Sequence, residues 1–125
     1  MAKFIDDSVM DAALAEVATA DSQIVTSAQP ANHAGIAAVA LGTISLTPGL
    51  GNGDFGAATN GDASGRKTTV ASQSGTASAS GSATHVCLDD GTTLLHVTTC
   101  STVSTNSGQA YTVSAYDVEF LDVTP

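Results

Sequence analysis

The chain has 125 residues, of which 42% are hydrophobic and 4% aromatic, and its three Lys and Arg residues leave a formal net charge of −9. This length predicts one β-domain over residues 1–125, with a thin core because the large aromatic side chains are scarce. The negative charge excludes nucleic acid and anionic membranes as partners, since their phosphates would be repelled, and it suits docking onto a positive protein surface.

The first predicted element is an α-helix over residues 6–18. Acidic and hydroxyl side chains at its start can cap the backbone N–H groups and suit the positive end of the helix dipole. Apolar residues then recur at helical spacing, at Val9, Met10, Ala13, Leu14 and Val17. Residues 1–5 form an arm ahead of this helix, with Phe4 and Ile5 as apolar contacts for a partner.

No stretch of the chain looks like a targeting or membrane segment. Acidic residues follow Ile5 directly, so the N-terminal segment lacks the apolar stretch of a secretory signal. No segment approaches the roughly 18 consecutive apolar residues of a membrane helix. We therefore expect synthesis in a cytoplasm and no membrane partner.

Short strands and loops fill the middle of the chain. Strands are predicted over residues 23–29 and 36–46, with a loop between them, and Pro48-Gly49 ends the second. Residues 49–65 are rich in Gly, Asn and Asp and predict a long loop, in which Leu50 and Phe55 are the apolar anchors. Two more strands, over residues 66–72 and 75–80, are expected around a turn near Ser74-Gly75.

The strongest local pattern lies in residues 80–100, which read as two strands joined by a two-residue Asp90-Gly91 turn. This turn sets a register in which Cys87 faces Leu94 and His85 faces His96. One face then carries the core residues Val86, Leu88, Leu95 and Val97. The other carries His85, Cys87, Leu94 and His96.

The second face of this hairpin predicts self-association. Cys87 and Leu94 stand where a solvated strand would carry charge, so we expect them in a subunit contact, and we expect a homotrimer. Cys87 and Cys100 are not aligned for a cross-strand bond in this register, which predicts free thiols.

The last predicted strand covers residues 110–123. Its apolar rhythm changes phase near Ala115-Tyr116, which predicts a β-bulge or bend there. With about seven strands at short spacing, the fold class is mainly β: a small antiparallel β-sandwich or barrel with one N-terminal α-helix.

The residues offer little chemistry. His85, Cys87 and His96 share a predicted face and are short of a zinc ligand set, and scattered aspartates match no calcium loop. There is no nucleophile elbow and no phosphate-binding loop, so we expect neither catalysis nor a cofactor. Arg66 and Lys67 are most of the positive charge; they read either as a contact with an acidic neighbour or as local pairing with Asp62.

Four segments of the chain carry a resemblance to a known family. They are the opening MAKFIDDSVMDAAL, the central GDASGRK of residues 61–67, the hairpin sequences of residues 79–86 and 94–100, and AYDVE of residues 115–119. Together they resemble small virion proteins encoded in the structural gene clusters of tailed bacteriophages.

This resemblance implies a non-enzymatic particle component. The expected role is a decoration, or cement, protein on the outer surface of the capsid, bound to the major capsid protein after synthesis in the host cytoplasm. The alternative is a tail or baseplate component with a receptor-binding or glycan-binding face. A cement protein needs a rigid β-fold and a projecting arm, and repetition over the capsid lattice makes modest contacts sufficient.

Overall fold

A computed structural model describes residues 4–122 of the chain. These residues contain nine β-strands and one α-helix, and every pair of named strands is antiparallel. The predicted fold class is confirmed, as a mainly β chain of the small sandwich-like or barrel-like kind with an N-terminal helix. The chain divides into two compact units, each assembled from segments far apart in the sequence. A single domain over residues 1–125 stays a prediction.

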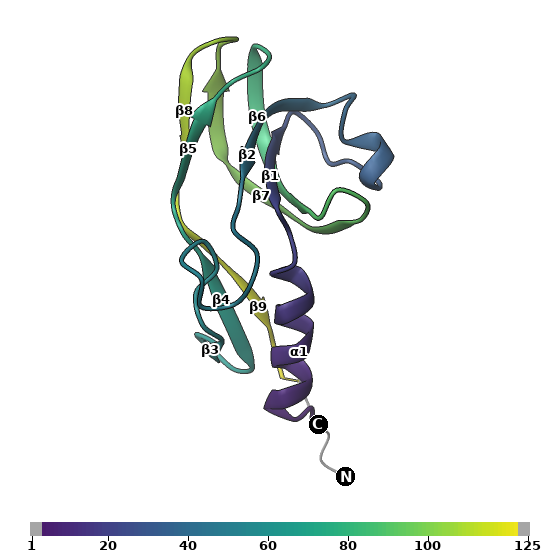
Figure 1. The fold of residues 1–125 in the computed structure, drawn as a ribbon, viewed down its shortest axis with the longest axis vertical. Helices are drawn as coiled ribbons and strands as arrows, with labels where there is room; N and C mark the ends of the chain where they lie inside the picture. Colours follow the sequence, from purple (N-terminus) through teal and green to yellow (C-terminus); the bar gives the residue numbers. More distant parts are fainter. Residues whose placement is uncertain (1–3, 123–125) are drawn as a thin grey trace. The chain divides into compact units, whose positions relative to one another are not determined.

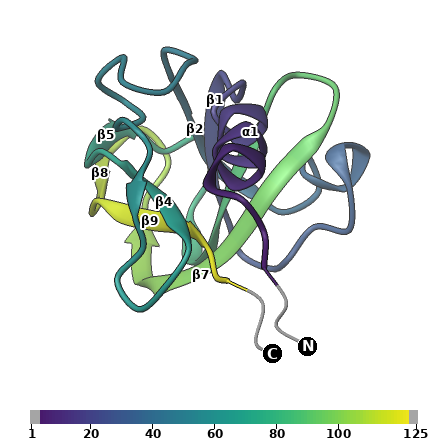
Figure 2. The same ribbon diagram turned by 90° about the horizontal axis from the view of Figure 1, so that it is seen from below.

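Unit 1 contains α1 (Asp7–Val17) and a three-stranded sheet, in the order β3 (Thr59–Asn60), β4 (Arg66–Val70) and β9 (Tyr116–Phe120). β4 and β9 lie side by side in both views (Figures 1 and 2). The helix begins where expected, because the Asp6 side chain accepts a hydrogen bond from Ser8 N at 2.9 Å.

The buried face of α1 is narrower than the sequence pattern suggests. Met10, Leu14 and Val17 are buried, whereas Val9 is 60% exposed. Successive residues of a helix are turned by about 100°, so a stripe through Met10 and Leu14 leaves Val9 on the flank. Val9 therefore belongs to the helical apolar pattern without lying in the core.

Residues 49–65 form the predicted long loop, interrupted only by β3. Phe55 anchors this loop: it is fully buried and forms isolated bridges with Leu50 and Val70. The loop closes where Gly61 N donates to Gly65 O at 2.9 Å. Gly65 has a φ of +74°, and a β-carbon on it would collide with the Phe120 carbonyl oxygen, so only glycine fits this turn.

Unit 2 contains a four-stranded and a two-stranded sheet (Figure 1). The larger sheet has the order β2 (Ala40–Ser45), β1 (Ser22–Thr26), β6 (Gly81–Asp89) and β7 (Leu94–Thr105), and the smaller pairs β5 (Gln73–Thr76) with β8 (Ala110–Val113). The sheets meet where the Tyr111 ring lies against Gly42, which has no room for a β-carbon. A short 3-10 helix, η1 (His33–Gly35), precedes β2, so the strand predicted from residue 36 begins at Ala40.

The predicted hairpin exists, but its turn and register were wrong. Four residues, not two, connect β6 to β7, and Asp90 does not have a positive φ. Instead, the Asp90 side chain accepts hydrogen bonds from Thr92 N at 2.9 Å and Thr93 N at 2.7 Å. The longer loop shifts the pairing, so that Cys87 faces Val97 and Leu88 faces His96.

Two strand boundaries also differ from the predictions. Ser74 and Gly75 lie inside β5, and the break falls at residues 71–72. The change of phase near Ala115-Tyr116 is a real discontinuity: β8 ends at Val113 and pairs in unit 2, and β9 begins at Tyr116 and pairs in unit 1. The pattern located a true irregularity, but it is a break between two strands rather than a bulge or bend within one.

Candidate contact surfaces

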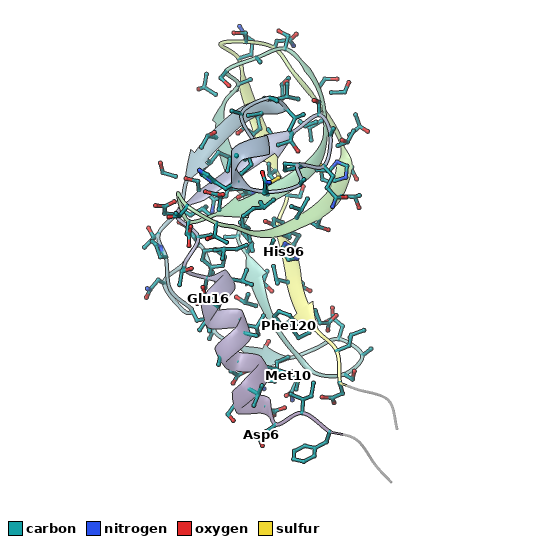
Figure 3. The ribbon with its side chains drawn as sticks, turned by 90° about the vertical axis from the view of Figure 1, so that its right-hand side faces the viewer. Asp6, Met10, Glu16, His96 and Phe120 are labelled. Carbon is teal, nitrogen blue, oxygen red and sulfur yellow. The ribbon has the colours of Figure 1, made fainter. Side chains whose placement is uncertain are left out.

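Exposed apolar side chains gather in unit 1. Phe4 is 81% exposed and Ile5 is partly buried, and residues 1–3 of the predicted arm lie outside the described residues. The large apolar side chains that are exposed among residues 4–122 all belong to unit 1: Phe4, Val9, Phe120 and Leu121. We call these four the apolar group. Figure 3 shows Phe120 on β9 near α1, two elements that contact each other.

Sequence reasoning found only part of the apolar group. Phe4 was expected as a contact, but Val9 was counted in the apolar pattern of the helix and Phe120 lay in an alternating strand. The available signal was the end of that alternation, because Phe120 and Leu121 are adjacent apolar residues and cannot both face a core.

Most of the acidic residues belong to the same unit. The sequence segments of unit 1 hold nine of the twelve acids and all three Lys and Arg residues, for a net charge of −6. Unit 2 holds three acids and no Lys or Arg, for a net charge of −3 with histidines neutral. Unit 1 is therefore the more acidic part and also the part with exposed apolar side chains.

The two predicted cationic contacts are occupied within unit 1. Arg66 donates from Nε and Nη2 to the two carboxylate oxygens of Asp11, at 2.8 and 3.2 Å, and from Nη1 to Asn60 Oδ1 at 2.9 Å. These bonds tie β4 to α1, and the hydrogen bond with Asp11 raises the pKa of Arg66.

Lys67 shows the local pairing that the sequence offered as one interpretation. Its Nζ lies 2.7 Å from Asp62 and 3.1 Å from Asp117, and the hydrogen bond to Asp62 is the main reason that its pKa is raised. Neither Arg66 nor Lys67 is free to attract an acidic partner. Their role as external contacts loses its main physical argument.

Cys87 cannot make a surface contact, because it is fully buried. It packs in a cluster with Ile24 and Ile36, and burial raises the pKa of its thiol. Its prediction as a subunit contact was wrong, because the β6–β7 register places it opposite Val97 and beneath the chain around Ile36. Cys87 and Cys100 are both free thiols, as expected.

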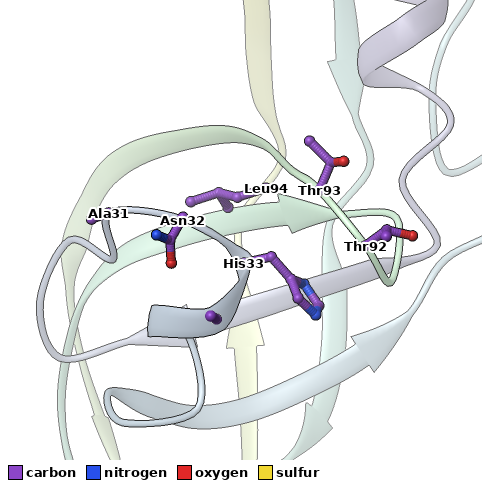
Figure 4. A pocket seen from close by; sticks show the side chains of 7 residues that line it. Ala31, Asn32, His33, Thr92, Thr93 and Leu94 are labelled. Carbon is purple, nitrogen blue, oxygen red and sulfur yellow. The ribbon is translucent and has the colours of Figure 1, made fainter.

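Leu94 is half-buried against the Cys87 cluster and lines a pocket of about 360 Å³ (Figure 4). Two loops of unit 2 form the pocket, which is lined by Ala31, Asn32, His33, Ala34, Thr92, Thr93 and Leu94. His33 Nδ1 lies 2.8 Å from Asp89 Oδ2, and the other oxygen of this buried carboxylate accepts from Gly91 N at 2.7 Å. The pair ties the loop before β2 to the end of β6.

The chemistry of this pocket is limited. Its lining has one ionisable side chain, His33, whose Nδ1 is already paired with Asp89. The other polar groups are one amide and two threonine hydroxyls, and the lining contains no aromatic ring. Such a pocket suits a small polar, uncharged group.

The possible zinc ligands are not brought together. Cys87 packs with Ile24 on one face of the sheet, whereas His96 faces Leu88 on the other. Within residues 4–122, no group of three or more His, Cys, Asp or Glu side chains is placed to hold a metal ion. The aspartates considered for calcium are used separately: Asp54 accepts from Thr47 N, and Asp62 from Lys67.

Polar atoms lie within the core of unit 2. Gln23 on β1 is fully buried and is paired with Leu88 on β6. Leu88 is in turn paired with His96 on β7. Neither amide atom of Gln23 has a hydrogen-bond partner, and the same is true of His96 Nδ1. Burial lowers the pKa of His96, because the charged imidazolium is poorly solvated there.

This shift predicts a pH-dependent stability. The ordinary pKa of histidine is 6.5, and a lower value in the folded state means that the unfolded chain binds more protons between the two values. The free energy of unfolding should therefore fall as the pH drops below about 6.5. Urea unfolding at pH 7.5 and 5.5 measures it, and His96→Gln should reduce the difference between the two pH values. His85→Gln, the control on β6, should keep it; an equal pH effect in His96→Gln would contradict the assignment.

Comparison with known proteins gives no relative: no family model, curated protein or solved structure matches the chain. No helix in the described part of the chain has the length and apolar character needed to cross a membrane. The surfaces of the two units are the features from which a function can be argued.

Proposed function

We propose that this chain is a non-enzymatic virion protein of a tailed bacteriophage, and that it decorates the outer surface of the head by binding the major capsid protein. The proposal starts from the resemblance of residues 1–14, 61–67, 79–86, 94–100 and 115–119 to small phage virion proteins. The observation that carries it furthest is the apolar group in the acidic unit 1.

The apolar group has the chemistry of a docking surface. Large exposed apolar side chains that gather on one part of a protein are typical of interaction sites. The net negative charge of the same unit adds a charge requirement, because it favours a partner that presents basic groups together with an apolar depression. Nucleic acid fails this requirement, whereas a protein shell with a positive outer surface meets it.

The expected strength of one such contact is modest. Burying apolar surface stabilises a complex by about 25 cal/mol per Å², and much of this gain is offset by the entropy lost on association. Two features raise the effective affinity on a capsid. The binding sites repeat over the lattice, and copies that associate with one another bind as a multivalent unit.

Self-association of copies is part of the proposal, and the homotrimer expected from the sequence is one form of it. Cys87 does not support a contact between copies, since that residue is buried. Leu94 is the one residue of the expected subunit contact that keeps partial exposure, and it belongs to unit 2. A contact between copies through unit 2 leaves the apolar group of unit 1 for the shell.

The second candidate is a tail or baseplate component with a receptor-binding or glycan-binding role. The pocket beside His33 favours it, because amide and hydroxyl groups around a small pocket suit a polar ligand such as a sugar hydroxyl. The absence of aromatic side chains from the lining of this pocket weakens the second candidate. Electron microscopy of the virion separates the two: hundreds of regularly placed copies on the head support decoration, and a few copies on the tail overturn it.

Removing the apolar group should weaken capsid binding. Replacing Phe4, Phe120 and Leu121 together with serine is expected to lower the affinity for purified heads by at least about tenfold, a loss of about 1.4 kcal/mol. The measurement is co-sedimentation of the purified protein with heads that lack it. Circular dichroism checks that the variant remains folded.

Leu94→Ser is the control for this measurement, because it removes a partly exposed apolar side chain from unit 2. If unit 1 is the docking surface, each copy of Leu94→Ser should bind heads as well as the unsubstituted protein does when the sites on the heads are saturated. Weak binding of Leu94→Ser together with normal binding of the triple variant would move the docking surface to unit 2.

A further inference from the structure

The larger sheet of unit 2 has an open edge at β7. This strand is hydrogen-bonded to β6 on one side, and no other strand in residues 4–122 pairs with its second side. At 12 residues it is about twice as long as an average strand. It contains no Asp, Glu, Lys, Arg or Pro, the residues with which proteins ordinarily protect an edge from pairing.

The opposite edge of the same sheet is interrupted by a contact with another segment. The Leu41 carbonyl on β2 accepts hydrogen bonds from Ser78 N at 2.9 Å and Ala79 N at 3.2 Å. The Ser78 hydroxyl adds a third contact to the same oxygen, at 3.3 Å. Among the described residues, β7 is therefore the edge of this sheet with no contact of this kind from another segment.

We propose that two copies of this chain associate by antiparallel pairing of their β7 strands, which joins their four-stranded sheets. An unpaired strand edge presents alternating N–H and C=O groups, and an extended backbone satisfies them. A ring or filament built from this sheet needs a second, different edge, and the contacts at Leu41 interrupt that edge. Pairing of the free edge with itself gives a closed two-fold contact.

Charge favours the same surface. The net charge of −9 makes two copies repel each other, but β7 has no charged side chain, and unit 2 contains only three acids. Each of the three is engaged: Asp21 accepts from Ser22, Asp89 is paired with His33, and Asp90 accepts from backbone N–H groups. Two copies that meet at β7 approach through the least repulsive part of the chain.

The geometry of β7 limits the extent of pairing. Its pairing with β6 is regular over residues 96–99, and irregular on both sides of that stretch. The strand also contacts β8, to which residues 106–109 connect its C-terminal end. Pairing is therefore centred on residues 96–99, and so short a contact gives a weak dimer, with a Kd of about 1–100 µM.

Sedimentation equilibrium of the free protein tests the proposal. Protein concentrations from about 1 to 500 µM span the expected Kd. Thr99→Glu/Ser101→Glu places two charges on exposed positions of β7 and should raise the Kd by about tenfold or more. Thr43→Glu/Ser45→Glu is the control, because it makes the same change at the same spacing on exposed positions of β2. It should change the Kd of the dimer by less than about threefold.

Amide hydrogen exchange supplies a readout that needs no variant. Protection of residues 96–99 should rise with protein concentration, while protection of β2 stays constant. A monomer at every concentration, a trimer, equal losses in the two double variants, or a dimer without this protection would overturn the proposal. The test uses the free protein, so its failure is distinct from failure to bind capsids.

Discussion

Phe55→Ala is expected to lower the free energy of unfolding by about 3–5 kcal/mol. Phe55 is the largest fully buried side chain in the described residues, and it sits in a loop that has few other apolar anchors. Its isolated bridges with Leu50 and Val70 hold residues 49–65 against β4. Alanine would leave a cavity and release this loop, and chemical denaturation measures the loss.

Phe4→Ala is the matched control, since it removes the same side chain from an 81% exposed position in the same unit. Its expected effect on the free energy of unfolding is within about 0.5 kcal/mol. A loss below about 1 kcal/mol for Phe55→Ala would show that the loop does not depend on this anchor.

The sequence predicted the features of this fold that depend on local chemistry. An acidic N-cap and periodic apolar residues give α1 in any tertiary setting that covers one face. Phe55 stood out as an anchor because the residues around it are small or polar. The change of phase at Ala115-Tyr116 marked the break between β8 and β9, because alternation reports directly on which side a strand buries.

The turn and register of the β6–β7 hairpin could not be determined from local chemistry. Asp90-Gly91 suits a two-residue turn, but an aspartate also accepts hydrogen bonds from the N–H groups that follow it, and the second arrangement is found here. The longer loop moves His96 opposite Leu88. A small difference in turn chemistry thus separates the three possible zinc ligands and buries an imidazole.

Contacts across long stretches of sequence could not be predicted at all. His33 and Asp89 are 56 residues apart, and Arg66 and Asp11 are 55 apart. Each residue had a reasonable local interpretation, as a loop histidine, a turn aspartate or a surface cation. The sequence offered local pairing with Asp62 as one interpretation, but only the fold reveals the pair of Arg66 with Asp11. With both cations paired internally, the argument for a partner moves from positive charge to the apolar group.

The two surfaces divide the expected interactions between the units. Unit 1 combines acids with exposed apolar side chains, which suits a partner of opposite charge and repels a second copy. Unit 2 has an uncharged open strand edge, which suits a second copy. A protein with both can bind a shell through one unit and a neighbour through the other, so a substitution in one unit can weaken one interaction while the surface of the other unit stays intact.

Gly65→Ala is expected to lower the free energy of unfolding by about 3 kcal/mol or more and to disrupt the pairing of β4 with β9. Two effects add at this position. The φ of +74° is unfavourable for alanine, and its β-carbon would collide with the backbone carbonyl of Phe120, which cannot turn aside as a flexible side chain can. Because Phe120 belongs to the apolar group, the variant should also lose binding to purified heads.

Gly51→Ala separates the two effects. Gly51 lies in the same unit with a φ of +80°, and a β-carbon there would meet no atom within 4 Å. Backbone strain alone should cost about 1–2 kcal/mol and leave binding to heads unchanged. Equal losses of stability in the two variants would show that the contact with β9 adds nothing to the requirement for glycine. A larger loss for Gly65→Ala would assign to GDASGRK a physical role, as the turn that lets β4 lie against the end of β9.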